Sequence, residues 1–119
     1  MPMKADLWFP TVIWNDHLKD VNNTELKEYV EKLVQEDKEG KVASNYGGWQ
    51  SKSFEILDQK PLAIERFIHS LQRCINECTK MAGMPDLIIS DYWWNINYHK
   101  DYNQPHNHRD SLLSGVYYI

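Results

Sequence analysis

The sequence predicts an α+β fold in which helices pack against a mainly antiparallel sheet. Two segments, residues 23–39 and 61–83, carry apolar residues at the spacing of an amphipathic helix. The last thirty residues, 90–119, instead contain two runs rich in aromatic and β-branched side chains, which favour strands. Both helical segments precede these runs, and this segregation of helices from strands is typical of the α+β class.

Composition bounds the function. With 119 residues, we expect one domain spanning positions 1–119. The net charge is −4 and no Lys/Arg cluster occurs, which argues against a nucleic-acid partner. No apolar run approaches the roughly 20 residues that cross a bilayer, and the N-terminus lacks the apolar region of a secretory signal. These features predict a cytoplasmic protein without a membrane partner.

The first apolar segment, residues 7–14, is rich in aromatic and β-branched residues. Because Pro10 cannot donate a ladder hydrogen bond, we expect this segment to be an edge strand or to contain a bulge.

A helix should follow, beginning after Asn22. Asn22 with Glu25 three residues later gives a capping signal, and Gly40 provides a stop. Residues 35–39 would form a charged, solvated last turn. The face that we expect to be buried comprises Leu26, Tyr29, Val30, Leu33 and Val34.

Residues 44–51 contain the pair Gly47-Gly48 between aromatic residues. Paired glycines permit positive φ angles and close backbone approach. Two interpretations remain open: a tight turn in which Tyr46 and Trp49 cover the core, or a part of a ligand pocket.

The second helix should begin near Pro61, a residue suited to a first helical turn, and end at Gly83. His69 falls outside its apolar stripe and is expected to face solvent. Cys74 and Cys78 are four residues apart, so they share a helix face as core thiols and lack the spacing of a redox or zinc motif. The predicted stripe comprises Ile64, Phe67, Ile68, Leu71, Ile75, Cys78 and Met81.

Residues 92–98 read as a strand whose side chains alternate between two faces. One face would carry Tyr92, Trp94, Ile96 and Tyr98, which we expect in the core. The other would carry Trp93, Asn95, Asn97 and His99. With two Asn it is either solvated or lines a polar site, because buried Asn needs hydrogen-bond partners.

The loop after this strand contains His106, His108 and Asp110. Residues two apart in an extended segment project to the same side, so the H-x-H pair or the H-x-D pair could approach one ion. Two imidazoles and a carboxylate are suitable ligands for Fe(II). The alternative is a polar turn with solvent-exposed histidines.

The loop lies within a longer pattern, N-x-x-H-x-H-x-x-S-x-L-S-G-V-Y-Y, at residues 103–118. Three further motifs occur in the same order: LWFPT at 7–11, GGWQS at 47–51 and WNIN at 94–97. Together they resemble a family of 2-oxoglutarate- and Fe(II)-dependent oxygenases common in phage and marine bacterial sequences. The resemblance runs from about residue 7 to the last residue.

This resemblance implies a double-stranded β-helix, a jelly-roll (cupin-like) core that holds Fe(II) and takes 2-oxoglutarate as co-substrate. His106 and His108 fall on the family's H-x-H positions, and Asp110 would complete an H-x-D pair as an addition of this sequence. The remaining expected contacts, to the co-substrate or to waters around the metal ligands, are Asn97, Ser114 and Tyr117.

The family's C-terminal half carries a distal His ligand and a basic residue that pairs with 2-oxoglutarate, and this chain has neither. We therefore expect an incomplete oxygenase domain, a partial jelly roll lacking its C-terminal strands. Three alternatives stay open: a fragment of an oxygenase, a small protein that completes its sheet as a homodimer, or a non-catalytic interaction module that retains the N-terminal half of the fold.

Overall fold

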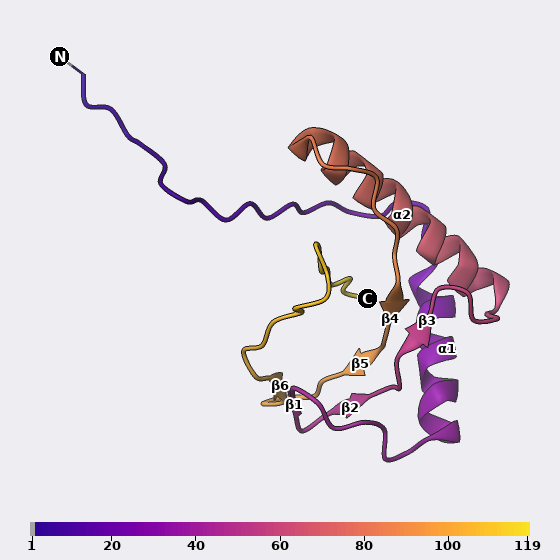
Figure 1. Ribbon diagram of the computed structural model, residues 1–119. Coiled ribbons are helices and arrows are strands. Elements are labelled where there is room, and N and C mark those ends of the chain that lie inside the picture. The colour runs from indigo at the N-terminus through magenta and orange to yellow at the C-terminus, as the bar shows by residue number, and fades with distance from the viewer. Residues whose placement is uncertain (1) are drawn as a thin grey trace.

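The structure, a computed structural model, describes residues 2–119 and confirms the α+β class. Figure 1 shows two helices on one side of a ribbon of short strands. The elements in chain order are α1 (Asn23–Glu36), β1 (Asn45–Tyr46), β2 (Trp49–Gln50), β3 (Phe54–Glu55), α2 (Leu62–Ala82), β4 (Asp91–Tyr92), β5 (Asn95–Ile96) and β6 (Tyr102–Asn103).

Helix α1 begins as the capping signal predicts, because the Asn22 side chain accepts a hydrogen bond from the backbone N–H of Glu25 at 3.2 Å. It ends at Glu36, so the expected continuation to residue 39 is wrong. The Asp37 carbonyl accepts a bond from the Trp49 indole N–H at 2.8 Å, which diverts the backbone from the helix. Gly40 lies in the turn that follows, and a Cβ added to Gly40 would lie 2.8 Å from atoms of the Trp49 ring.

The strands form an interrupted antiparallel ribbon, in which β1 pairs with β6, β2 with β5, and β3 with β4. This confirms antiparallel pairing, but as three two-residue ladders in place of a broad sheet. One hydrogen bond bridges the gap between the β2–β5 and β3–β4 ladders, from Ser51 N–H to the Trp94 carbonyl at 2.9 Å, and another extends the β1–β6 ladder outwards, from Gln104 N–H to the Ser44 carbonyl at 2.6 Å. The jelly-roll part of the expectation stays a prediction.

Residues 47–48 lie opposite the longer stretch 97–101 between the first two ladders. Both glycines have positive φ, +71° and +64°, and both approach the opposite segment closely, as predicted. Trp49 is buried in the core, whereas Tyr46 is exposed and stacks on Tyr102 with ring centroids 5.0 Å apart. The expectation that Tyr46 covers the core is therefore wrong.

Helix α2 connects the two halves of the ribbon and ends at Gly83, as predicted, and Gly83 adopts a left-handed conformation. Pro61 occupies the N-cap, one residue before the helix. The N-terminal part of the predicted stripe is buried, but Met81 is exposed because the last turn extends beyond α1 and the ribbon. His69 is exposed, as expected. Cys74 and Cys78 are free and only half-buried, so the prediction of core thiols is met in part.

The core lies between the two helices and the ribbon. Trp94 occupies its centre, with ring centroids 5.9 Å from Tyr29, 5.8 Å from Phe67 and 6.2 Å from Tyr92. The buried apolar residues are Leu26, Val30, Trp49, Ile64, Phe67, Ile68 and Trp94.

The expected strand at residues 92–98 is divided into β4 and β5. Its predicted inner face is confirmed for Tyr92, Trp94 and Ile96, which belong to the core or pack against it. Tyr98 is 71% exposed, because the ribbon opens into the stretch 97–101 before it pairs again. On the opposite face Asn95 and Asn97 are exposed and solvated, whereas Trp93 is half-buried.

Two predicted strands do not form in the part of the chain that the structure describes. Residues 7–14 are unpaired and without strand structure, and Phe9 has a positive φ of 53° and is 95% exposed. Figure 1 shows this N-terminal arm running away from the helices. Residues 112–119 are also without strand structure, although Tyr117 packs against the core. High β-propensity stabilises a strand only where a neighbouring backbone completes the ladder.

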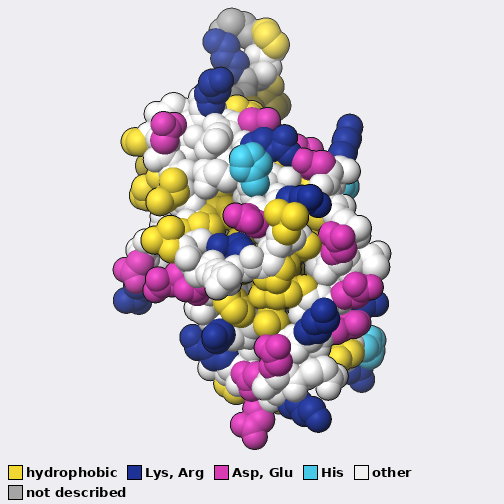
Figure 2. Space-filling model, turned by 90° about the vertical axis from the view of Figure 1, so that its right-hand side faces the viewer, with side chains coloured by type: hydrophobic (Ala, Val, Ile, Leu, Met, Phe, Trp, Pro, Cys, Tyr) yellow, Lys and Arg dark blue, Asp and Glu magenta, His cyan; other side chains and the backbone are white. Residues whose placement is uncertain are grey.

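The face that carries the two helices has a mixed charge distribution. Figure 2 shows acidic and basic side chains interspersed there, with apolar side chains between them near the centre. Within residues 2–119, neither helix combines the length and apolar character that crossing a bilayer requires.

Tyr92 should stay protonated well into the alkaline range. Desolvation raises its pKa from 10.0 to about 12, with smaller contributions from Tyr29 and Asp58. Because the folded-state pKa lies above the unfolded value, this stabilisation is complete below pH 10.0 and is lost as the pH rises towards 12. Tyrosinate absorbance and circular dichroism, recorded together, measure the effect. Tyr92→Phe should lose less stability across the same window; equal losses in both proteins would contradict the assignment.

Candidate functional site

A groove of about 500 Å³ lies beside the ribbon. The segment before β1 contributes Lys41 and Ser44, and the loop after β6 contributes residues 104–108. Gln50 of β2 and Asp91 of β4 belong to opposite strands of the ribbon and also line it. The antiparallel pairing therefore brings four separate parts of the sequence to one concave surface.

His106 and His108, the predicted metal ligands, both line this groove and are close together. Their ring centroids are 4.8 Å apart with the rings nearly perpendicular. His106 Nδ1 lies 2.7 Å from the Gln104 carbonyl oxygen. Since a carbonyl only accepts, Nδ1 carries the proton and Nε2 keeps its lone pair for a ligand. His108 is half-buried against Trp93, with ring centroids 5.5 Å apart.

The structure places the predicted carboxylate differently. Asp110 is exposed in the turn that follows His108 and does not line the groove. The carboxylate in the groove belongs to Asp91, which accepts hydrogen bonds from Ser90 Oγ at 2.7 Å and Ser53 Oγ at 3.2 Å. Sequence reasoning missed Asp91, because only the strand register brings it towards the histidine loop.

The three predicted co-substrate contacts lie outside the groove lining. Asn97 is exposed on the stretch beside Gly48, and Ser114 is exposed in the C-terminal segment. Tyr117 packs on Phe67 with ring centroids 4.9 Å apart and donates a hydrogen bond to Asn23 Oδ1 at 2.6 Å. These contacts hold the C-terminal segment against α1 and α2.

The donor set fits a metal ion in part. Two neighbouring imidazoles are suitable for a transition-metal ion. Across residues 2–119, however, no three His, Cys, Asp or Glu side chains are grouped so that they could hold an ion. The three-ligand face that the family resemblance implies is not assembled, so we derive no reaction step through iron.

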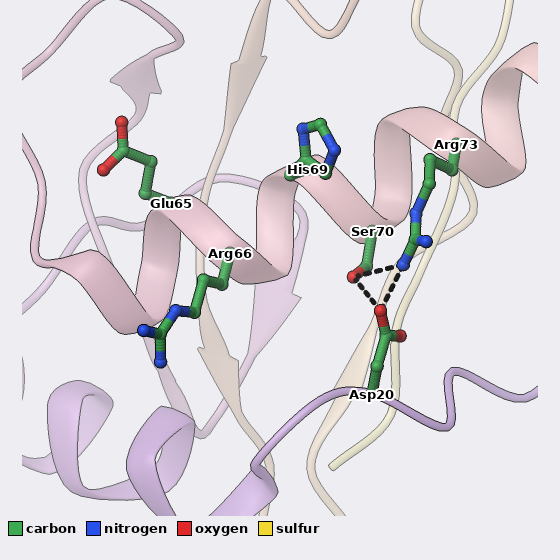
Figure 3. A pocket seen from close by; sticks show the side chains of 6 residues that line it. All are labelled: Asp20, Glu65, Arg66, His69, Ser70 and Arg73. Atoms are coloured by element: carbon green, nitrogen blue, oxygen red, sulfur yellow. Dashed lines mark hydrogen bonds and ion pairs between the residues drawn. The ribbon is translucent and has the colours of Figure 1, made fainter.

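A second concave region of about 430 Å³ lies on α2. Figure 3 shows Asp20, from the segment before α1, pointing towards Ser70 and Arg73. Arg73 donates to the Asp20 carboxylate, and Ser70 Oγ lies 3.2 Å from the same oxygen. The pKa of Asp20 is lowered by a hydrogen bond from its own backbone, and then by those of Ser70 and Arg73. These contacts link the segment before α1 to α2, but both charged groups are more than half exposed, so the ion pair contributes little to stability.

Gln50 also lines the groove. It belongs to the motif at 47–51, but no role was predicted for it from the sequence. Its side chain is only 6% exposed, and its Oε1 is buried without a hydrogen-bond partner in the described residues. Buried polar atoms nearly always have a hydrogen-bond partner. The unpaired Gln50 oxygen is therefore a feature of the groove that, in the described part of the chain, the concave region on α2 does not share.

Comparison with protein-family models, curated proteins and solved structures gives no match to this chain.

Proposed function

We propose that this chain is an Fe(II)- and 2-oxoglutarate-dependent oxygenase of the hydroxylase type, or a part of one. In this proposal, the groove around His106 and His108 is its metal-binding region and 2-oxoglutarate is its small-molecule co-substrate. The jelly-roll architecture and a cytoplasmic location belong to the same proposal.

One observation carries most of the support. His106 and His108 come together on one groove wall, and the Gln104 carbonyl leaves His106 Nε2 available. The resemblance adds a second line of support, because the groove gathers residues from separate motifs. Gln50 comes from the motif at 47–51, and the two histidines come from the motif at 103–118.

Anaerobic addition of Fe(II) and 2-oxoglutarate should produce a weak metal-to-ligand charge-transfer band in visible absorption. His106→Ala should abolish the band, because it removes one of two imidazole ligands. His69→Ala is the matched control, since His69 is exposed on α2 and should leave the band unchanged. A parallel assay measures uncoupled conversion of 2-oxoglutarate to succinate in air.

Two further variants show which carboxylate takes part. Asp110→Asn should weaken the band if the loop supplies the H-x-D pair, whereas Asp91→Asn should weaken it if the groove carboxylate contributes. The absence of both the band and succinate production in the unmodified protein would exclude the oxygenase proposal for this chain.

A non-catalytic interaction or oligomerisation module is the second candidate. The observation that favours it is the N-terminal arm, on which Leu7, Phe9 and Ile13 are highly exposed. Exposed clusters of large apolar side chains mark protein interaction sites. The mass in solution tests this candidate: a dimer that becomes monomeric in Phe9→Ser supports it, and a monomer at all concentrations contradicts self-association.

A further inference from the structure

Gln50 lines the same groove as the histidine pair, and its Oε1 is buried without a hydrogen-bond partner in the described residues. A buried acceptor without a hydrogen bond destabilises the fold. A glutamine whose oxygen stays unpaired is therefore explained best by a partner that arrives from outside the chain.

The groove surface around Gln50 indicates the chemistry of that partner. Lys41 supplies a cation, and its backbone is fixed by a 2.7 Å hydrogen bond from its N–H to the Gln50 carbonyl oxygen. Trp93 supplies an aromatic wall on the opposite side of the ribbon. The terminal amide torsion of glutamine is broad, so Oε1 can turn towards a donor in the groove. Concave sites with a few polar groups and an aromatic wall are typical of small-molecule binding.

We propose that this groove binds a small carboxylate that also carries an amide or amine N–H. The N–H donates to Gln50 Oε1 and the carboxylate pairs with the Lys41 ammonium group. This inference rests on the groove geometry and holds with or without a metal ion, so it is independent of the proposed oxygenase activity.

N-acetylglycine is a suitable probe, because it combines a carboxylate with one amide N–H. Acetoxyacetate is its matched analogue, in which an ester oxygen replaces that N–H. Titration of each into the isotope-labelled protein, with a chelator present, should shift backbone NMR signals of the groove residues. N-acetylglycine should bind about tenfold more tightly, because only it satisfies the Gln50 oxygen.

Gln50→Met keeps the side-chain length but removes the acceptor. This variant should bind both probes equally, and its unfolding midpoint should be unchanged or higher because the unpaired oxygen is gone. Lys41→Met should weaken both probes, whereas Lys38→Met, outside the groove, should weaken neither.

Three results would overturn the inference. They are an absence of shifts at groove signals, equal binding of the two probes by the unmodified protein, or retained discrimination in Gln50→Met. A large stability loss in Gln50→Met would also count against it, because that loss indicates a structural hydrogen bond. Since the chelator excludes metal, a negative iron experiment leaves this test unaffected.

Discussion

Replacing Trp94 with serine should lower the free energy of unfolding by about 3 to 5 kcal/mol. Trp94 is only 8% exposed and contacts residues from both helices and the ribbon. Its indole N–H has no hydrogen-bond partner among the described residues, so the loss comes from packing and the resulting cavity. Urea unfolding followed by circular dichroism measures the change.

The matched control is Trp8→Ser, the same substitution at a tryptophan that is 79% exposed on the N-terminal arm. Surface changes of this kind usually alter stability by no more than about 0.5 kcal/mol. Similar losses in the two variants would show that Trp94 is not in the core, or that the arm is packed in solution.

The helices were predictable from the sequence because their signals are local. The Asn22 cap, the apolar spacing of α1 and the left-handed Gly83 each depend on residues within a few positions. The errors lie at the ends of the helices, because tertiary contacts determine the residue at which a helix stops. The Trp49 indole N–H donates a hydrogen bond to the Asp37 carbonyl oxygen, and no apolar pattern near residue 37 indicates that contact.

The strands were predicted less well because strand formation depends on a partner backbone. Residues 7–14 have strong β-propensity but no neighbouring strand in the described part of the chain. The residues of the candidate site divide in the same way, into those predicted from local sequence and those that depend on strand pairing. His106 and His108 were predicted together because they lie two residues apart in the sequence, whereas Asp91 and Gln50 reach the groove only through the ribbon register.

Gly48→Ala should destabilise the protein by about 2 to 5 kcal/mol, through two separable effects. Gly48 has φ +64°, a conformation that costs an L-residue about 1 to 2 kcal/mol. An added Cβ would also overlap the Ile96 carbonyl oxygen and lie 2.7 Å from Asn97 Oδ1. Because Ile96 belongs to β5, relief of this overlap requires the β2–β5 ladder to move, at a further cost of about 1 to 3 kcal/mol.

Two other glycines separate these effects. Gly83 has φ +63° with no atom within 4 Å of a Cβ, so Gly83→Ala should show the conformational cost alone. Gly115→Ala meets no atom within 4 Å and should change stability by no more than about 0.5 kcal/mol. The same urea experiment ranks all three variants. If Gly48→Ala costs no more than Gly83→Ala, the close approach of residues 47–48 to β5 does not exist in solution. The ribbon register that brings Gln50 and Asp91 to the histidine groove would then require revision, because the β2–β5 pairing defines it.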